Sequence, residues 1–80
     1  MIIKESDKFK SIKSKLDQSY LIRLEKLIKK IISNTEIGKP MRYNRKDTRE
    51  VYVGSFRLSY SFDKNINTLF LLDFYHKDEQ

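Results

Sequence analysis

The stretch Arg49–Phe62, R-E-V-Y-V-G-S-F-R-L-S-Y-S-F, decides the fold of this chain. Two runs of alternating apolar and polar residues meet at Gly54-Ser55, a two-residue connection typical of a tight β-hairpin. Because side chains alternate across a strand, this register predicts one apolar and one polar face. The apolar face holds Val51, Val53, Phe56, Leu58, Tyr60 and Phe62, and the polar face holds Glu50, Tyr52, Arg57, Ser59 and Ser61.

Upstream of the hairpin, the sequence predicts a short strand and two helices. Ile2 and Ile3 indicate the strand, and Ser6 is the expected N-cap of a helix with Phe9, Ile12 and Leu16 on one face. Asp17 or Ser19 is expected to begin a second helix, which ends before Gly38 and Pro40. Its apolar stripe comprises Tyr20, Leu24, Leu27, Ile28 and Ile31, widened by Leu21 and Ile32. We expect this helical hairpin to cover the apolar face of the sheet, with Leu24, Leu27 and Ile31 deeply buried.

The segments on either side of the hairpin are also assigned from their patterns. Met41–Thr48 is basic and aperiodic, which predicts a short edge strand followed by a loop. Asp63-Lys64-Asn65 predicts a turn, and Thr68–Tyr75 a last strand. Four consecutive apolar residues, Leu69 to Leu72, favour a central position for this strand, beside the N-terminal one. Counting by twos puts Phe70, Leu72 and Phe74 in the core and Asp73, Tyr75 and Lys77 on the face of Arg57.

Composition narrows the possible functions. Eighty residues predict one domain spanning residues 1–80, and the absence of cysteine excludes a disulfide framework. With no membrane-length apolar run and no signal-peptide pattern, we expect a cytoplasmic protein without a membrane partner. The net charge of +6 favours an anionic partner. A basic cluster, which is equally compatible with a solvated face, comprises Lys39, Arg42, Arg45, Lys46 and Arg49.

The predicted polar face carries the residue types that bind and cut RNA. Cations hold phosphates, tyrosines stack unpaired bases, and a carboxylate or an imidazole moves a proton. The candidates on or near this face are Glu50, Tyr52, Arg57, Asp73, Tyr75, His76 and Lys77. We expect Asp73 to orient Arg57 or Lys77. Strict alternation points His76, the only histidine, toward the core side. With one histidine and scattered carboxylates, we expect no metal site. The sequence also lacks a glycine-rich phosphate loop, so we expect no small-molecule cofactor.

Three motifs resemble the RelE/ParE superfamily of toxins from bacterial and archaeal toxin–antitoxin systems. They are G-K-P-M-R-Y (38–43), R-E-V-Y-V-G-S-F-R-L-S-Y (49–60) and L-L-D-F-Y-H-K-D (71–78), of which V-G-S-F-R-L-S-Y is the most specific. The resemblance implies an α+β fold of βααβββ order, with two N-terminal helices packed on a mainly antiparallel four-stranded sheet. It also implies an antitoxin as partner. In this superfamily the RelE branch cuts mRNA in the ribosomal A site by attack of a 2′-hydroxyl on the neighbouring phosphate, and the ParE branch poisons DNA gyrase.

The resemblance assigns roles to individual residues. Arg57 matches the hairpin arginine that contacts the scissile phosphate, His76 matches a histidine of the family, and Lys77 stands where many members have arginine. Glu50 and Tyr52 replace two basic residues of RelE, and the chain stops at Gln80 without the family's C-terminal tyrosine.

Two functions are compatible with these matches and departures. The first is a ribosome-dependent mRNA endonuclease with Arg57, Lys77, His76 and Glu50 as catalytic residues. RNA binding would fall to Tyr52, Tyr75, Arg42, Arg45, Lys46 and Arg49. The alternative is a non-catalytic toxin, either a ParE-like gyrase inhibitor or a degenerate member that only binds its antitoxin or RNA. The first function requires the ribosome and mRNA as partners in addition to the antitoxin.

Overall fold

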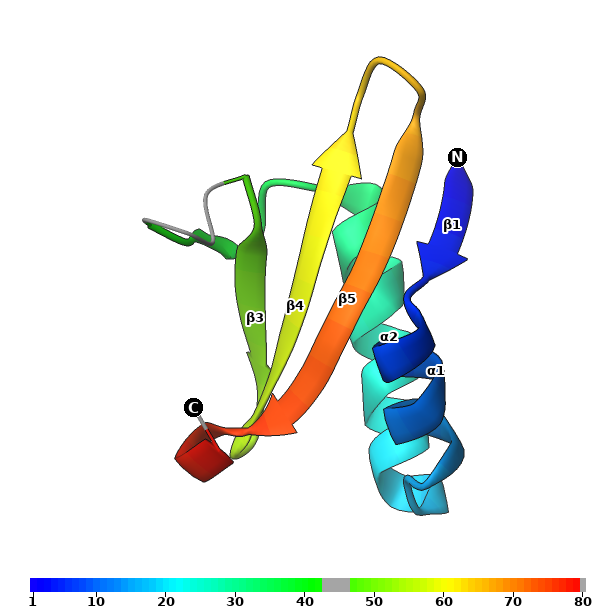
Figure 1. Ribbon diagram of the computed structural model, residues 1–80, viewed down its shortest axis with the longest axis vertical. Coiled ribbons are helices and arrows are strands. Elements are labelled where there is room, and N and C mark those ends of the chain that lie inside the picture. Colours follow the sequence, from blue (N-terminus) through cyan, green and yellow to red (C-terminus); the bar gives the residue numbers. More distant parts are fainter. Residues whose placement is uncertain (43–46, 80) are drawn as a thin grey trace.

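The computed structural model describes residues 1–42 and 47–79, and within them a sheet is flanked by helices (Figure 1). The strands are β1 (Ile2–Glu5), β2 (Lys39–Pro40), β3 (Arg49–Val53), β4 (Phe56–Asp63) and β5 (Thr68–His76). Their order in the sheet is β1-β5-β4-β3-β2, with β1 parallel to β5 and every other pair antiparallel. Helices α1 (Asp7–Ser14) and α2 (Gln18–Ser33) lie between β1 and β2, and a short 3₁₀ helix, η2 (Lys77–Glu79), follows β5.

The predicted α+β fold is confirmed, with one more strand in the sheet than the four that the resemblance implies. The additional strand is β2, which pairs Lys39 with Glu50 and Pro40 with Arg49 at the edge of the sheet. An edge position suits Pro40, because proline has no N–H to donate to a second neighbour. The predicted edge strand in Met41–Thr48 therefore lies slightly earlier in the chain. Most of the predicted loop lies outside the described residues.

Local signals place the hairpin and the helix starts where the sequence predicted them. Tyr52 pairs with Arg57 and Val51 with Leu58, and Gly54 adopts the positive φ of 56° that such turns require. The Ser6 hydroxyl accepts a hydrogen bond from the Phe9 N–H at 3.0 Å and donates one to the Leu72 carbonyl at 2.7 Å. The N-cap of α1 thereby also fastens this helix to β5.

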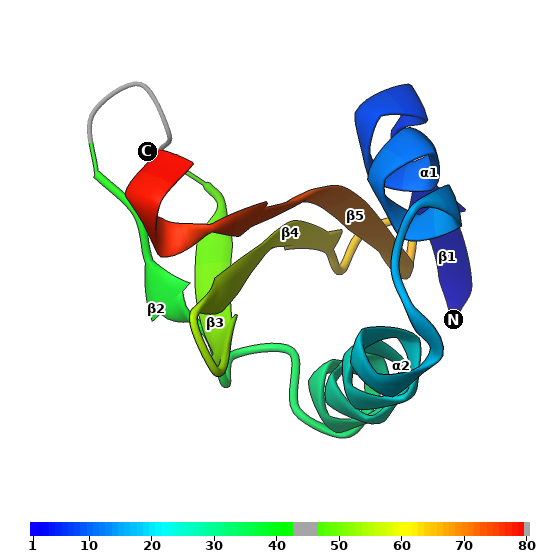
Figure 2. The same ribbon diagram turned by 90° about the horizontal axis from the view of Figure 1, so that it is seen from below.

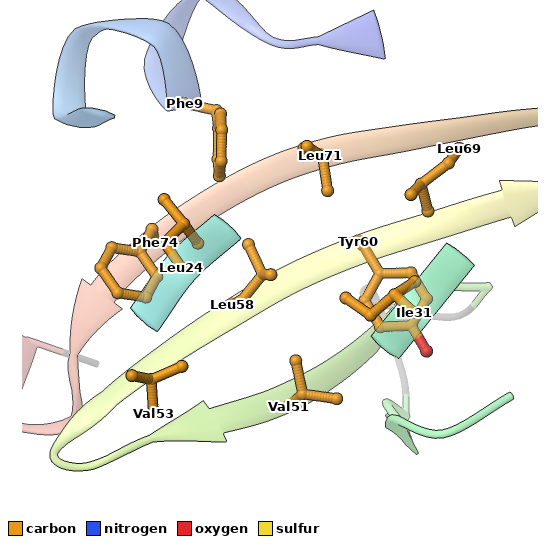
Figure 3. Packing of buried hydrophobic residues seen from close by; sticks show 10 residues of the cluster. All are labelled: Phe9, Leu24, Ile31, Val51, Val53, Leu58, Tyr60, Leu69, Leu71 and Phe74. Carbon is orange, nitrogen blue, oxygen red and sulfur yellow. The ribbon is translucent and has the colours of Figure 1, made fainter. Parts of the chain in front are cut away.

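The core lies between α2 and one face of the sheet, with α1 beside β5 and β1 (Figure 2). Phe9, Leu24 and Ile31 are fully buried, and they pack with side chains of β3, β4 and β5 (Figure 3). Leu27 is only partly buried, so the prediction of deep burial at this position is wrong. At 3.6 residues per turn, Leu27 lies about 60° around the helix from Leu24, at the flank of the stripe rather than along its centre.

A β-bulge changes which residues of β5 face the core. Leu58 pairs with Phe74 and Ser59 with Asp73, but Tyr60 pairs with Leu71, so that Leu72 has no counterpart in β4. An inserted residue reverses the alternation beyond it. Leu69 and Leu71 are therefore buried in the core at 0% and 1% exposure. The predicted core positions of Phe70 and Leu72 are wrong, because that prediction assumed unbroken alternation.

None of the helices in the described ranges is both long enough and apolar enough to cross a membrane.

Candidate functional site

The polar side chains of the sheet form two rows across β3, β4 and β5. One row contains Tyr52, Arg57 and Tyr75, and the other contains Glu50, Ser59 and Asp73. Both rows lie between the start of β4 and the bulge, where side chains still alternate simply. The predicted polar face is therefore confirmed in this part of the sheet. We call these six residues the polar face.

Arg57 and Tyr52 form the exposed part of the polar face. The Arg57 guanidinium carbon lies 4.7 Å from the centre of the Tyr52 ring, within the range of a cation–π interaction. Tyr52 is 54% exposed, and the Arg57 side chain is 28% exposed. An accessible aromatic ring and a permanent positive charge are therefore held side by side on adjacent strands.

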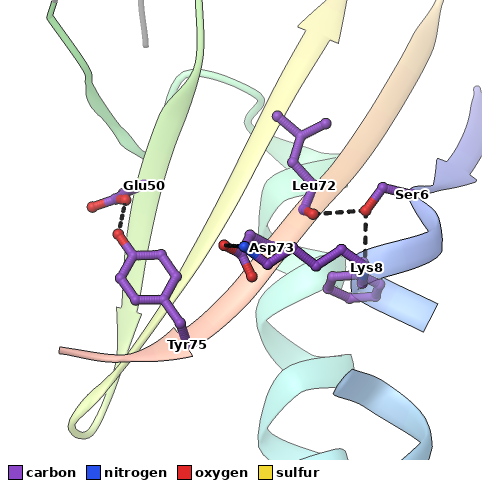
Figure 4. Close-up of polar contacts among 7 residues, drawn as sticks. Ser6, Lys8, Glu50, Leu72, Asp73 and Tyr75 are labelled. Carbon is purple, nitrogen blue, oxygen red and sulfur yellow. Dashed lines mark hydrogen bonds and ion pairs between the residues drawn. The ribbon is translucent and has the colours of Figure 1, made fainter. Parts of the chain in front are cut away.

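Glu50 is a buried carboxylate beneath this pair. It is 2% exposed, and one of its oxygens accepts a hydrogen bond from the Tyr75 hydroxyl (Figure 4). Its other oxygen lies 3.8 Å from Nη1 of Arg57. A carboxylate this deeply buried requires hydrogen bonds and a nearby cation to remain in the fold. Tyr75 and Arg57 supply both.

Tyr75 occupies a different position from the one its proposed role requires. The sequence suggested that this tyrosine stacks an RNA base, but its side chain is 9% exposed and its hydroxyl is directed at Glu50. It therefore belongs to the site as a support for the carboxylate. Tyr52 retains the exposure that stacking requires.

Asp73 is paired with a residue that the sequence analysis did not single out. Its Oδ2 lies 3.0 Å from Nζ of Lys8 in α1, so the expectation that Asp73 orients Arg57 or Lys77 is wrong. Lys8 is one of several similar lysines in α1, and nothing in the helical pattern distinguishes it. Only the packing of α1 beside β5 brings this lysine to the polar face (Figure 4).

His76 lies away from Arg57, on the side that alternation predicted. It is the partner of Phe56 in β4, and the two rings meet edge to face at 5.4 Å. Nδ1 of His76 accepts a hydrogen bond from the Asp78 N–H at 3.3 Å and lies 3.4 Å from the Asp78 carboxylate. These contacts describe a histidine that closes the end of β5.

Lys77 lies just past the end of β5, next to the hairpin turn. Its main-chain N–H donates to the Ser55 carbonyl at 2.8 Å, and its side chain is exposed. This contact fixes the backbone of Lys77 beside Ser55, which precedes Arg57 by two residues. The backbone of Lys77 therefore lies at the hairpin end of the polar face.

The basic cluster is divided between the two faces of the sheet, with Lys39 opposite Glu50 of the polar face and Arg49 on the other face. Arg49 pairs with Tyr60, which faces the core, and its Nη1 donates to the carbonyls of Gly38 at 2.8 Å and Glu36 at 3.2 Å. Arg42 is exposed, and Arg45 and Lys46 lie outside the described residues. The structure therefore places Arg49 on the opposite face of the sheet from Tyr52 and Tyr75.

A buried tyrosine holds the connection between α2 and β2, which the sequence analysis did not foresee. Tyr60 is 0% exposed, its hydroxyl donates to the Thr35 carbonyl at 2.8 Å, and it accepts from the Gly38 N–H at 2.9 Å. A side chain at Gly38 would collide with this ring, because an added Cβ would lie 2.8 Å from it. Burial raises the pKa of Tyr60, although the hydrogen bond from Gly38 opposes the shift.

The described residues contain no group of three or more histidine, aspartate or glutamate side chains placed to hold a metal ion. Arg57 can bind an anion, Tyr52 can stack a ring, and Glu50 can accept a proton.

Comparisons with known proteins show which family and fold this chain shares. A family model described as the ParE toxin of the type II toxin–antitoxin system parDE matches residues 6–80. The toxin–antitoxin complex RelBE2 of Mycobacterium tuberculosis is similar in structure, with a TM-score of 0.83 and 21% identity over 94% of this chain and 95% of that chain. No curated protein sequence matches significantly.

Two further solved structures show the same fold. The intact RelBE complex of E. coli has a TM-score of 0.81 at 14% identity, over 94% of each chain. A metal-bound toxin from Helicobacter pylori has a TM-score of 0.75 at 26% identity, over 99% of this chain and 97% of that chain. The chain therefore belongs to the ParE toxin family of type II toxin–antitoxin systems, within the RelE/ParE superfamily of toxins.

Proposed function

We propose that this toxin inhibits translation in the cytoplasm by cutting mRNA on the ribosome, in the manner of RelE. The observation that carries the proposal is the position of Arg57, 4.7 Å from the exposed ring of Tyr52 and 3.8 Å from the buried carboxylate of Glu50. Two adjacent strands thereby bring together a cation that can bind phosphate, a ring on which a base can stack, and a carboxylate that can accept a proton.

Arg57 is assigned to the scissile phosphate. Its planar guanidinium can donate two parallel hydrogen bonds to phosphate oxygens and remains charged throughout the physiological range. Because it projects from the paired part of β4, the strand fixes its backbone before the substrate arrives. Tyr52 is assigned to a neighbouring base, which would stack on the part of the ring that remains exposed.

Glu50 is assigned to the proton of the attacking 2′-hydroxyl. The 2′ oxygen forms a bond to phosphorus as its proton passes to the carboxylate, and the bond from phosphorus to the 5′ oxygen breaks. The products are a 2′,3′-cyclic phosphate and a 5′-hydroxyl, which takes its proton from water. Arg57 and Lys77 stabilise the negative charge that develops on the phosphate oxygens.

An antitoxin protein is the expected physiological partner. The similar structures from M. tuberculosis and E. coli are described as toxin–antitoxin complexes. A net charge of +6 on this chain favours an antitoxin that is acidic where it meets the toxin. Such a partner would compete with RNA for the same cations.

The proposal is tested by translating a defined mRNA in a cell-free system and mapping cuts by primer extension, with and without ribosomes. Wild type should produce cuts that require ribosomes. Arg57→Ala and Arg57→Lys should both lower the rate, by about 10²–10³ if Arg57 acts as a preorganised electrostatic donor. Arg23→Ala is the matched control, because Arg23 also lies over a tyrosine ring, that of Tyr20 at 5.4 Å, but projects from α2. Unchanged cleavage in both Arg57 variants would place the site elsewhere.

A second function is favoured by the burial of Glu50. A carboxylate that is 2% exposed and already bound by Tyr75 could serve only to hold Arg57, which would make the polar face a binding surface without catalysis. The toxin would then act by binding its target, as in the gyrase inhibition of the ParE branch. Growth arrest by wild type with intact mRNA would favour this second function over the nuclease.

A further inference from the structure

An open hollow lies away from Arg57, beside the distal part of β4. Strand β3 pairs with β4 only as far as Tyr60, so Ser61, Phe62 and Asp63 extend past the end of their neighbour. The space beside them is an open hollow of about 720 Å³. Its size is within the range of small-molecule sites, which measure roughly 300–1,000 Å³.

The bulge at Leu72 supplies this hollow with an aromatic ring. Because alternation reverses beyond the bulge, Phe70 leaves the core, pairs across the sheet with Ser61 and is only partly buried. Phe70 and Ser61 both line the hollow. Without the inserted residue, Phe70 would lie in the core and this part of the sheet would present no aromatic surface.

Acidic residues outnumber basic ones around the hollow. Its rim carries the carboxylates of Glu36, Asp47 and Asp63. One oxygen of Asp63 accepts from the Asn65 N–H at 2.9 Å, which fixes the direction of the carboxylate. Of the two cations at the rim, Arg49 already donates to the carbonyls of residues 36 and 38. Three carboxylates disfavour a phosphate here and favour a neutral group that donates hydrogen bonds.

We propose that this hollow is a second RNA subsite, which takes a base bearing an exocyclic amino group. The base would stack on Phe70, and its amino group would donate to Asp63. Ser61 lies four residues from Arg57 along β4, a distance of about 13 Å at roughly 3.3 Å per residue. One single strand of RNA can therefore occupy both places. This inference rests on the proposed function, because it assumes that RNA binds along this side of the sheet.

The test measures binding of fluorescently labelled oligoadenylate, oligocytidylate and oligouridylate to the full chain by anisotropy at low salt. Wild type should bind the first two more tightly than oligouridylate, because uracil has no exocyclic amino group. Phe70→Leu should weaken binding of the first two roughly tenfold, the scale of one lost base–aromatic stack. Phe70→Tyr keeps the ring and should bind as wild type does.

Two further variants test the details of the subsite. Asp63→Asn should reduce the preference over oligouridylate, since an amide can also donate to a uracil carbonyl. Ile66→Ala is the control in the same β4–β5 connection, where Ile66 is 56% exposed and does not line the hollow. It should bind all three oligomers as wild type does.

The outcomes separate this inference from the proposed function. If folded Phe70→Leu binds like wild type while Arg57→Ala binds more weakly, the hollow is not a subsite and the proposed function stands. If neither variant changes binding, both proposals fail. Should Phe70→Leu not fold, Asp63→Asn decides, and an unchanged base preference in that variant would overturn the subsite.

Discussion

Replacing Tyr60 with phenylalanine removes a single hydroxyl oxygen from a fully buried side chain. That oxygen donates to the Thr35 carbonyl and accepts from the Gly38 N–H, and the ring is 0% exposed. Gly38 is itself buried, so its N–H cannot exchange the lost partner for water without a shift of the backbone. The variant therefore leaves one buried donor unsatisfied, at the point where the chain passes from α2 to β2.

The expected loss of stability follows from this contact. A buried polar group left without its partner costs about 1–3 kcal/mol, and a domain is typically stable by only about 5–15 kcal/mol. For a chain of this length, each kcal/mol lowers the melting temperature by about 4–8 °C. With a cost of about 2 kcal/mol, Tyr60→Phe should melt about 8–16 °C below wild type at neutral pH.

The raised pKa of Tyr60 adds a dependence on pH. Burial lifts the pKa of its hydroxyl above the ordinary value of 10.0, so the folded state holds this proton more tightly than the unfolded state does. The stabilisation is complete below pH 10.0 and is lost as the pH rises through the folded-state pKa. Wild type should therefore lose stability in that alkaline window faster than Tyr60→Phe, and the two melting curves should converge.

The measurement is thermal unfolding followed by circular dichroism, from neutral pH to about pH 11, beyond the ordinary tyrosine pKa. Tyr20→Phe is the control, because Tyr20 is only partly buried and its hydroxyl has no hydrogen-bond partner within residues 1–42 and 47–79. Equal melting temperatures for wild type and Tyr60→Phe at neutral pH would refute the reasoning. So would parallel curves at alkaline pH.

Two further predictions concern the core and the site. Leu24→Ala should lower the free energy of unfolding by about 2–5 kcal/mol, and Leu27→Ala by clearly less, as urea titrations of both variants can measure; equal losses would contradict the burial described here. Under the proposed nuclease function, Tyr75→Phe should leave ribosome binding intact but slow single-turnover mRNA cleavage, because Glu50 loses the hydroxyl that orients it. A wild-type cleavage rate in Tyr75→Phe would show that this hydrogen bond has only a structural role.

Features that depend on neighbours in the chain could be predicted from the sequence. The Gly54-Ser55 turn fixed the pairing of Tyr52 with Arg57, and the caps at Ser6 and Asp17 lie where short polar side chains precede apolar periodicity. In each case the deciding hydrogen bonds or backbone angles lie within a few residues. These parts of the fold could therefore be predicted without knowledge of any tertiary contact.

Features that depend on distant segments could not be predicted. The bulge at Leu72 arises from how β4 and β5 pair along their whole length, and one extra residue moved Phe70 from the predicted core to the opposite face. The pairing of Asp73 with Lys8 depends on where α1 lies. The position of Arg49, in contrast, was predictable, because alternation along β3 puts it on the same face as Val51. Its proposed role in RNA binding was based on its charge and not on this position.

The geometry of Glu50 explains how Arg57 can be held in place and still bind a ligand. The distance of 3.8 Å between Nη1 of Arg57 and the nearer carboxylate oxygen exceeds the usual hydrogen-bond range of about 2.7–3.2 Å. The attraction is therefore mainly electrostatic, and it keeps the guanidinium near the carboxylate although Nη1 donates no short hydrogen bond to that oxygen. Tyr75 meets the carboxylate's need for a donor instead.

Because of this division of roles, Arg57 need not break a short hydrogen bond to Glu50 when it turns to a phosphate. The Tyr52 ring, 4.7 Å from the guanidinium carbon, limits the orientations that Arg57 must lose on binding. A lysine at position 57 could keep the attraction to Glu50, but it lacks the planar group that stacks on the ring and donates two parallel hydrogen bonds. The arrangement of these four side chains thus requires arginine for its shape as well as for its charge.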